Sequence, residues 1–381
     1  MSAPTRRQEA GFTLIELLVA VALGLALTLA ITLMLVRYES GRRSTTSMND
    51  TTIGSAYVSY ALDRLVRSAG SGYTQAWRNA FGCQVFASRA GTTTLPRATA
   101  FPAPFAAVPQ AVRLAPVVIH AGAGTDGSDV LAIQTGSSGL GESPLPVMPG
   151  SATTASLRLP STLGLRANDL VMVFQDATVC MVQQVATGFA GGANQQLDFA
   201  GTYADDDING VLLSSMGSPL SAWIAPLGNL NGNQPQFQLV GVGANATLVS
   251  HDILQLGGNN NVVAIADGVA DLRARYGVDT NNDNVIDDWR DPAVAPWNAA
   301  TLLNGSGPSQ RRLSQIVAVR VAVLVRTHSP ERNSPTAGQI PLFADLAASA
   351  TRTLTADEQQ LRWRTVDFTI PLRNVLLAPR P

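Results

Sequence analysis

The segment Gly11-Phe12-Thr13-Leu14-Ile15-Glu16 is followed by an uncharged run of 20 residues, Leu17 to Val36. A helix rises about 1.5 Å per residue, so this run would be roughly 30 Å long, the thickness of a bilayer's hydrocarbon core. Glu16 stands at the start of the run among apolar neighbours. An ionised carboxylate next to hydrocarbon is costly and persists where it finds a partner. The segment therefore predicts a membrane-spanning helix over about 17–36 with a functional acid at its start.

Residues 11–20, GFTLIELLVA, resemble the cleavage and assembly motif of type IV pilins and of the pseudopilins of type II secretion. The short leader, residues 1–11, fits this resemblance because it carries two arginines and has no apolar core. The resemblance implies that a prepilin peptidase cuts after Gly11 on the cytoplasmic side and that Phe12 becomes the N-methylated first residue. It also implies that Glu16 pairs with the N-terminal amine of a neighbouring subunit. The physics agrees, because a buried carboxylate and a buried ammonium each lack a partner until two subunits meet.

Two other kinds of N-terminal segment explain less. A secretory signal peptide has a shorter apolar core that ends in a small-residue cleavage site. Ala20-Val21-Ala22 has that form, but the apolar run continues well beyond it. A plain single-pass anchor accounts for the run and for the leader arginines through the positive-inside rule, but it leaves Glu16 unexplained.

Composition points to a turn-rich β protein beyond the helix. The chain has 381 residues, with 33 Gly and 22 Pro and only 6% aromatic residues. Its formal net charge is −1 and 14% of residues are charged, so no broad basic surface predicts nucleic-acid binding. We expect an α+β, pilin-like fold in which one long N-terminal helix, residues 12–69, packs on a large β-rich globular head, residues 70–381.

Cys83 and Cys180 are the two cysteines of the chain, and both lie beyond the predicted membrane helix. If that side is the periplasm, the compartment favours a disulfide between them. Closing a loop of about a hundred residues would stabilise the head by a few kcal/mol. The alternative is two separate buried thiols. Neither cysteine belongs to a C-x-x-C motif, so dithiol catalysis is not expected.

The second half of the long helix is expected to pack on the head through Val58, Leu62, Leu65 and Ala69, which fall on one stripe. We expect the helix to loosen near Gly41 and to end at 70–72, GSG, since glycine supplies the left-handed cap. Residues 73–109 are predicted to be a loop and 262–275 a short helix. The predicted strands are 117–120, 129–135, 169–174, 179–185, 237–241, 316–325 and 365–370.

The head resembles the PilW group of minor pilins through the order of several short blocks. These blocks are 169–173 (DLVMV), 267–269 (DGV), 276–279 (YGVD), 316–320 (IVAVR) and 372–374 (LRN). Each block is short, and their order carries the resemblance.

Two further motifs suggest chemistry. Residues 122–127, GAGTDG, match G-x-G-x-x-G, but strand-like sequence follows where a dinucleotide site needs a helix, so we predict a hairpin turn. Residues 279–288 carry oxygen side chains at alternate positions, as do the calcium loops of EF-hand and dockerin type. The candidate ligands for Ca2+ are the side chains of Asp279, Asn281, Asp283 and Asp287 and the carbonyl of Val285.

The calcium loop has two departures and one alternative. The sixth position is Asn284 rather than Gly, and the twelfth is Arg290 rather than Glu, although Asp288 or Asp291 could substitute for that glutamate. The alternative is an Asn/Asp turn held by its own side-chain hydrogen bonds.

No catalytic spacing is present, so an enzyme is not expected: the histidines at 120, 251 and 328 lie far apart in the chain. The resemblance implies a minor pilin of PilW type that takes part in type IV pilus assembly, in a priming or tip complex. Its partners would be other minor and major pilins, the prepilin peptidase and the inner-membrane assembly platform.

The expected location is the bacterial inner membrane, crossed once with the head in the periplasm, and then a surface pilus. Two rival functions remain open. A type II secretion pseudopilin would be distinguished by its neighbouring genes. A pilus-tip adhesin or ligand-binding module would be distinguished by binding of the head to surfaces or DNA.

Overall fold

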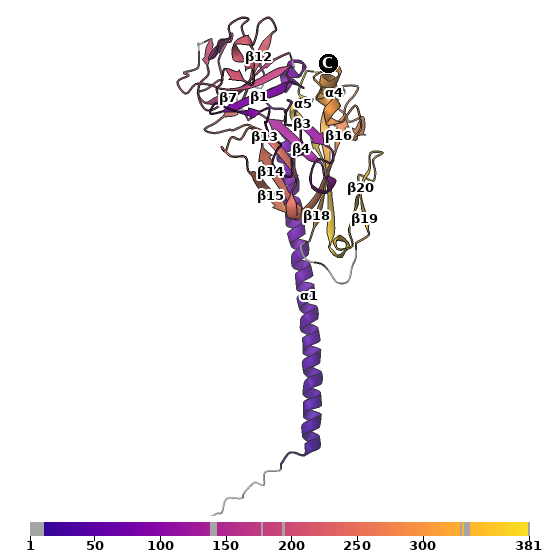
Figure 1. The fold of residues 1–381 in the computed structure, drawn as a ribbon. Helices are drawn as coiled ribbons and strands as arrows, with labels where there is room; N and C mark the ends of the chain where they lie inside the picture. Colours follow the sequence, from indigo (N-terminus) through magenta and orange to yellow (C-terminus); the bar gives the residue numbers. More distant parts are fainter. Residues whose placement is uncertain are drawn as a thin grey trace, which may run out of the picture. The chain divides into compact units, whose positions relative to one another are not determined.

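The structure is a computed structural model that describes residues 11–137, 143–176, 178–192, 195–327, 330 and 336–379. The chain divides into two compact units, one ending at Asp50 and the other running from Thr51 to Pro381 (Figure 1). The predicted leader lies outside the described residues, apart from Gly11.

The predicted long helix is confirmed as α1, Leu14–Arg67, with 54 residues. It does not loosen near Gly41. There the hydroxyl of Thr45 donates to the carbonyl of Gly41 (3.0 Å), one turn earlier. The predicted end is also confirmed, because Gly70 and Gly72 have φ of +83° and +93°. At both positions the left-handed backbone favours glycine.

From Thr51 onward, α1 buries one face in the head. Val58, Leu62, Val66 and Ala69 are almost completely buried, while Leu65 is half-buried against the same core. This arrangement confirms the predicted apolar stripe, whose spacing of three and four residues keeps its members on one side of a helix.

Three sheets of four to six strands make up most of the described head. The six-stranded sheet has the order β2 (Thr92–Leu95), β1 (Gln84–Arg89), β8 (Val179–Gln184), β7 (Asp169–Gln175), β12 (Ala222–Asn229), β5 (Leu145–Pro146). The five-stranded sheet has the order β15 (Val262–Asp267), β14 (Thr247–Asp252), β13 (Gln236–Val242), β4 (Val130–Thr135), β3 (Val117–His120). The four-stranded sheet has the order β17 (Asp288–Arg290), β16 (Val269–Val278), β18 (Ile316–Arg326), β21 (Trp363–Pro371).

Short elements complete the described head. Three strand pairs are β6 (Ser156–Arg158) with β9 (Gln196–Asp198), β10 (Asp207–Ile208) with β11 (Val211–Leu212), and β19 (Gln339–Leu342) with β20 (Ala350–Thr353). The α-helices are α2 (Trp77–Ala80), α3 (Ala299–Leu302), α4 (Gly307–Gln315) and α5 (Arg373–Leu376). The 3-10 helices are η1 (Thr74–Ala76), η2 (Thr125–Gly127), η3 (Leu213–Ser215), η4 (Ala244–Ala246) and η5 (Glu358–Gln360).

All seven predicted strands are confirmed, and the motif at 122–127 is a turn between antiparallel β3 and β4, as expected. The predicted helix over 262–275 is wrong. Those residues form β15 and most of β16, separated by Gly268 at φ +80°. The helical spacing of Ile265, Val269 and Leu272 was misleading because Ile265 belongs to β15 and the other two belong to β16, so these residues do not share one face of one element. The predicted loop over 73–109 is partly wrong, since it contains β1 and β2.

The head has one main core and a second core on the opposite face of the six-stranded sheet. Along β7, Leu170, Met172 and Phe174 point into the main core, while Val171 and Val173 point into the second. The second core is closed mainly by residues between 145 and 216.

Candidate functional site

The N-terminal end of α1 is held by a reciprocal pair of polar contacts. The backbone N–H and the hydroxyl of Thr13 both donate to Oε2 of Glu16, at 3.2 and 3.1 Å. In return, the backbone N–H of Glu16 lies 3.4 Å from the Thr13 hydroxyl oxygen. This is a capping box, in which a Thr and a Glu three residues later satisfy each other's backbone donors. The sequence signal is Thr-x-x-Glu, so Thr13 is a site residue that could have been identified from the sequence.

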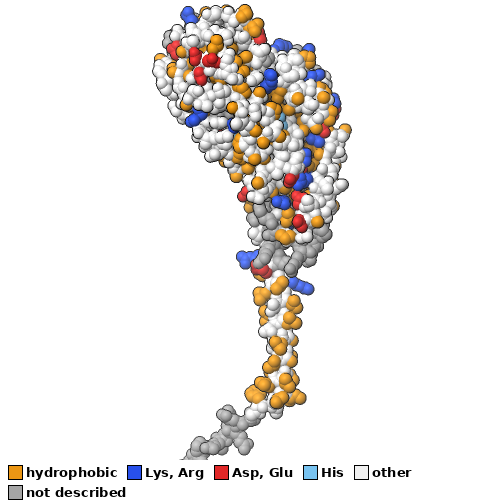
Figure 2. All heavy atoms as spheres, viewed as in Figure 1, with side chains coloured by type: hydrophobic (Ala, Val, Ile, Leu, Met, Phe, Trp, Pro, Cys, Tyr) orange, Lys and Arg blue, Asp and Glu red, His pale blue; other side chains and the backbone are white. Residues whose placement is uncertain are grey.

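The first unit exposes apolar side chains along α1, and Figure 2 shows them on the face in view. Consecutive residues such as Leu17, Leu18 and Val19 are all exposed, so the apolar side chains lie on every side of the helix. Between Leu14 and Val36 the large apolar side chains of α1 are half exposed or more. By length and composition, Leu14–Glu39 can span a membrane. A helix with apolar residues on every face needs an apolar surrounding, either lipid or other apolar helices.

Cys83 and Cys180 form a disulfide, with their Cα atoms 5.6 Å apart. Cys83 directly precedes β1, Cys180 lies within β8, and these two strands run parallel as neighbours in the six-stranded sheet. Both side chains are completely buried. The predicted pairing is therefore present, and it joins segments 97 residues apart in sequence.

The candidate calcium loop connects β16 to β17, which pair as an antiparallel hairpin. Asp279 is completely buried at the start of the loop. Its carboxylate accepts from the backbone N–H groups of Asn282 (2.6 Å), Asp283 (3.2 Å) and Asn284 (2.8 Å). These hydrogen bonds are typical of an Asx turn, in which an Asp side chain binds the backbone of its own loop. They agree with the Asn/Asp turn that was the alternative to a calcium loop.

The other candidate ligands also bond within the loop. Asp287 accepts from the backbone N–H and hydroxyl of Thr280 at 2.7 and 2.6 Å, and these bonds lower the pKa of its carboxyl. Asn281 donates to Asp283 (3.1 Å), which in turn accepts from the N–H of Val285 (2.8 Å). Among the described residues, no group of three or more His, Cys, Asp and Glu side chains is arranged to hold a metal ion. Calcium binding by this loop stays a prediction.

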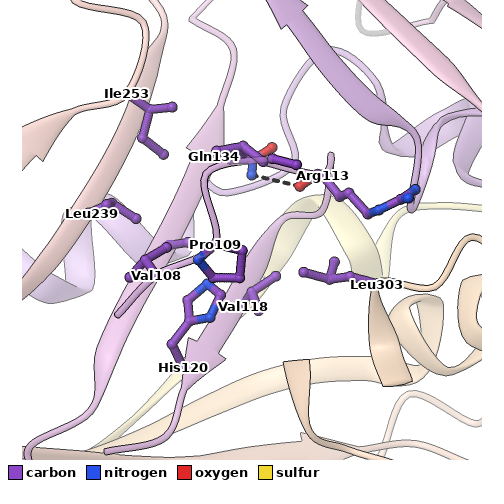
Figure 3. Close-up of a pocket in the computed structure, with 12 residues that line it drawn as sticks. Val108, Pro109, Arg113, Val118, His120, Gln134, Leu239, Ile253 and Leu303 are labelled. Atoms are coloured by element: carbon purple, nitrogen blue, oxygen red, sulfur yellow. Dashed lines mark hydrogen bonds between the residues drawn. The ribbon is translucent and has the colours of Figure 1, made fainter. Parts of the chain in front are cut away.

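Two histidines are buried in the head at separate places. His120 lines a cavity of about 20 Å³, with room for about one water, between apolar side chains such as Val108, Val118 and Leu239. Figure 3 shows its imidazole beside Pro109. Burial lowers the pKa of His120 to about 4.

His251 packs edge-on against Phe101, with ring centroids 5.7 Å apart, and burial also lowers its pKa. Both rings are therefore neutral at pH 7, and each belongs to apolar packing. His328 lies outside the described residues.

Two family models match the chain. The model of the prokaryotic N-terminal methylation motif matches residues 6–32. The model of the type IV pilus-assembly protein W, PilW, matches residues 238–374, about a third of the chain. Comparison with curated proteins and with solved structures gives no significant match.

The methylation motif, the apolar first half of α1 and the β-rich head together support a type IV pilin-like protein that is anchored in a membrane. The match over 238–374 gives the group within that class. Together the two matches support a minor pilin of PilW type with a role in type IV pilus assembly. Pilins of the PilW type are structural rather than enzymatic, and the likeness to them implies interaction with other pilus components.

Proposed function

We propose that this protein is held in the inner membrane by residues 17–36 until it enters a pilus-priming or tip complex. A prepilin peptidase removes residues 1–11, and Phe12 becomes the N-methylated first residue. Residues 12–69 are then the assembly helix, and residues 70–381 are a periplasmic head that is carried to the cell surface. The other minor and major pilins and the inner-membrane assembly platform are its partners.

The observation that carries this proposal is the position of the Glu16 carboxylate. It accepts from the N–H of Thr13, the second residue of the expected mature chain. The proposed cleavage therefore creates a new ammonium on Phe12, the residue directly before Thr13, whose backbone N–H donates to the Glu16 carboxylate. A carboxylate can accept from several donors, so Glu16 can keep its capping bonds while it pairs with the amine of a neighbouring subunit. In apolar surroundings this pairing would be strong, because neither group has another partner of opposite charge there.

The size of the head supports a place at the tip or at initiation rather than in the shaft. Its second core, built between 145 and 216, adds bulk on the outer face of the six-stranded sheet. A subunit in the shaft is surrounded laterally by other subunits and has less room for this second core than a subunit at the tip.

The test compares three variants of the full chain in the native strain. Glu16→Gln keeps an oxygen that can accept from Thr13 but removes the charge, whereas Thr13→Ala weakens the cap and keeps the charge. Glu16→Ala removes both. We expect surface filaments to be lost with Glu16→Gln and Glu16→Ala and to persist with Thr13→Ala. Filament numbers equal to wild type in Glu16→Gln would refute charge pairing.

A second measurement tests the processing step. Mass spectrometry of the purified protein should show a mature chain that begins at methylated Phe12. A chain that still begins at Met1 would refute the proposal, whatever the filament counts.

A further inference from the structure

The outer face of the four-stranded sheet places two arginines directly opposite each other. In the antiparallel pairing of β16 with β18, Arg275 faces Arg320. Like charges at directly opposed positions destabilise a sheet unless something compensates them. Beside them lies Trp289 of β17, whose ring packs over Gly277 so closely that a Cβ there would approach the ring to 2.9 Å. Asp367 of β21 partly compensates the pair, because it accepts from Arg320 at 2.8 and 2.7 Å. The face therefore offers two guanidinium groups, one of them already paired within the sheet, and an aromatic surface.

A separate segment, residues 336–361, covers this face, and we call it the strap. It contains the hairpin of β19 and β20, which Figure 1 shows beside β16 and β18. Phe343 of the strap is almost completely buried, with its ring 5.1 Å from the guanidinium carbon of Arg275 and 5.6 Å from that of Arg320. Two cation–π contacts to one ring are a specific way to recognise an aromatic side chain.

The strap also supplies a carboxylate and a carbonyl to the two arginines. Asp345 accepts two hydrogen bonds from Arg320, at 2.8 and 2.9 Å, a bidentate geometry that fits a guanidinium. These bonds lower the pKa of the Asp345 carboxyl. The carbonyl of Ala348 accepts from Nε of Arg275 at 2.7 Å. The two arginines thus contact the aromatic ring of Phe343, and Arg320 also binds the carboxylate of Asp345, two residues later in the chain.

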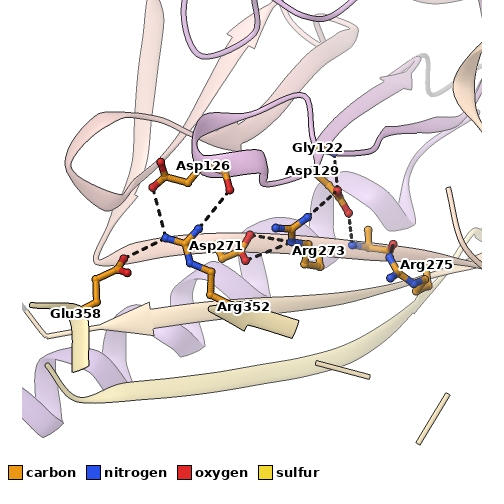
Figure 4. A network of polar contacts seen from close by, with 9 residues as sticks. Gly122, Asp126, Asp129, Asp271, Arg273, Arg275, Arg352 and Glu358 are labelled. Carbon is orange, nitrogen blue, oxygen red and sulfur yellow. Dashed lines mark hydrogen bonds and ion pairs between the residues drawn. The ribbon is translucent and has the colours of Figure 1, made fainter. Parts of the chain in front are cut away.

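The strap is attached to the head by side chains rather than by a shared sheet. Among the described residues, the backbone hydrogen bonds of the strap run within it, and its two strands pair only with each other. Its second attachment is Arg352, which bonds Glu358 of the strap (3.1 Å) and reaches Asp126 of the β3–β4 turn (3.5 Å) (Figure 4). The chain leaves and rejoins the sheet at Thr327 and Arg362, which are bonded to each other. Displacement of the strap would therefore break none of the sheet's backbone hydrogen bonds among the described residues.

Two features weaken the binding of the strap to the sheet. Phe343 has φ of +53°, a left-handed backbone that is unfavourable for a bulky residue. Asp345 is largely exposed, with 62% of its side chain open to solvent, so water competes for its bonds to Arg320. The apolar contact beneath the strap is small, with Ala322, Leu324, Leu342 and Phe343 as its buried members.

We propose that the face built on Arg275, Arg320 and Trp289 is a binding site for an extended segment of a partner protein, and that the strap is its resting occupant. The partner segment carries an aromatic side chain and, two residues later, a carboxylate, as Phe343 and Asp345 do in the strap. Binding requires the strap to leave, so the apparent affinity falls with the fraction of molecules in which the face is open. This inference does not depend on the N-terminal assembly mechanism.

The test uses the full chain in detergent micelles and a fluorescent peptide of residues 340–347, IPLFADLA. In the variant Phe343→Ala/Asp345→Ala the strap loses the ring and the carboxylate that contact the two arginines, while the arginines and the attachment through Arg352 remain. We expect the peptide to bind this variant about tenfold more tightly than it binds wild type. A control peptide with Ala in place of its Phe and Asp should not bind, and Arg320→Gln in the opened variant should abolish binding. Equal binding of both peptides, or no binding to a folded opened variant, would overturn the proposal.

Asp345→Ala alone provides a second variant if the double variant does not fold, because its position is exposed. It should still increase peptide affinity severalfold. Hydrogen exchange of the wild-type chain supplies an independent measurement: the amides of β19 and β20 should exchange faster than those of β16 and β18. Exchange of the strap at the same rate as the sheet would mean that the strap does not open on its own, and the proposal would fail.

Discussion

Removal of the disulfide between Cys83 and Cys180 should lower the stability of the head without unfolding it. The bond joins two neighbouring parallel strands, β1 and β8, at the boundary of the main core. Replacing both cysteines with Ala removes the bond and leaves two small apolar side chains in its place. The sheet keeps its hydrogen-bond ladder, so the fold should persist.

The size of the effect follows from the loop that the bond closes. The cysteines are 97 residues apart, and the chain-entropy model gives about 4.7 kcal/mol for a loop of that length. The unit from Thr51 to Pro381 has about 330 residues, and unfolding entropy near 2.1 cal/mol/K per residue gives it roughly 0.7 kcal/mol/K. The melting temperature should therefore fall by about 7 °C.

The assay is thermal unfolding of the full chain in detergent, followed by circular dichroism, with and without dithiothreitol. The melting temperature of wild type should fall by about 7 °C on reduction, whereas Cys83→Ala/Cys180→Ala should melt at the lower temperature in both conditions. Thiol titration of the unfolded, unreduced wild type should find no free thiol. Two reactive thiols there, or a melting temperature that reduction does not change, would refute the reasoning.

Three further predictions concern the loop at 279–287 and the cavity at His120. Asp279→Ala should destabilise the head by about 3 kcal/mol in chemical denaturation, because three backbone N–H groups lose an acceptor at about 1 kcal/mol each; Asp283→Ala, at an exposed position, should cost less than half as much. If the loop binds calcium, millimolar Ca2+ should raise the melting temperature of wild type and not that of Asp283→Ala; no rise in wild type would end the calcium hypothesis. The lowered pKa of His120, about 4 against 6.5 unfolded, means that the unfolded chain binds the extra proton. Wild type should therefore lose up to about 3 kcal/mol between pH 7 and pH 4 relative to His120→Gln, as measured by denaturation at several pH values.

The sequence predicts best where the physical constraint is local. The 20-residue apolar run, the Gly70 and Gly72 end of α1, and β18 with its repeated valines are each specified by residues within one segment. The capping box at Thr13 and Glu16 is equally local. It was not identified from the sequence, although the Thr-x-x-Glu spacing is its signal.

The features that could not be predicted from the sequence depend on contacts between residues that are distant in the chain. Residues 262–275 have helical spacing, but β16 pairs with β18, some fifty residues later, and its two faces meet different neighbours. The strap site depends on Arg275 lying opposite Arg320 and on Phe343 lying between them. No spacing within one segment reveals that arrangement, because it exists only once three separate segments have met.

The groups that pack on the two faces of a sheet also explain why some strands could be predicted from the sequence and β16 could not. The six-stranded sheet has the main core on one face and the second core on the other, and the four-stranded sheet has the main core on one face and the strap on the other. Strands buried on both sides read as continuous apolar runs, as β7 and β18 do, and such runs are visible without knowing their partners. On β16 the strap side carries Asp271, Arg273 and Arg275 instead of apolar residues, and their polar contacts replace apolar burial. The misassigned strand β16 therefore carries charged rather than apolar groups on its outer face. A recognition site for a charged and aromatic partner would be expected on such a face.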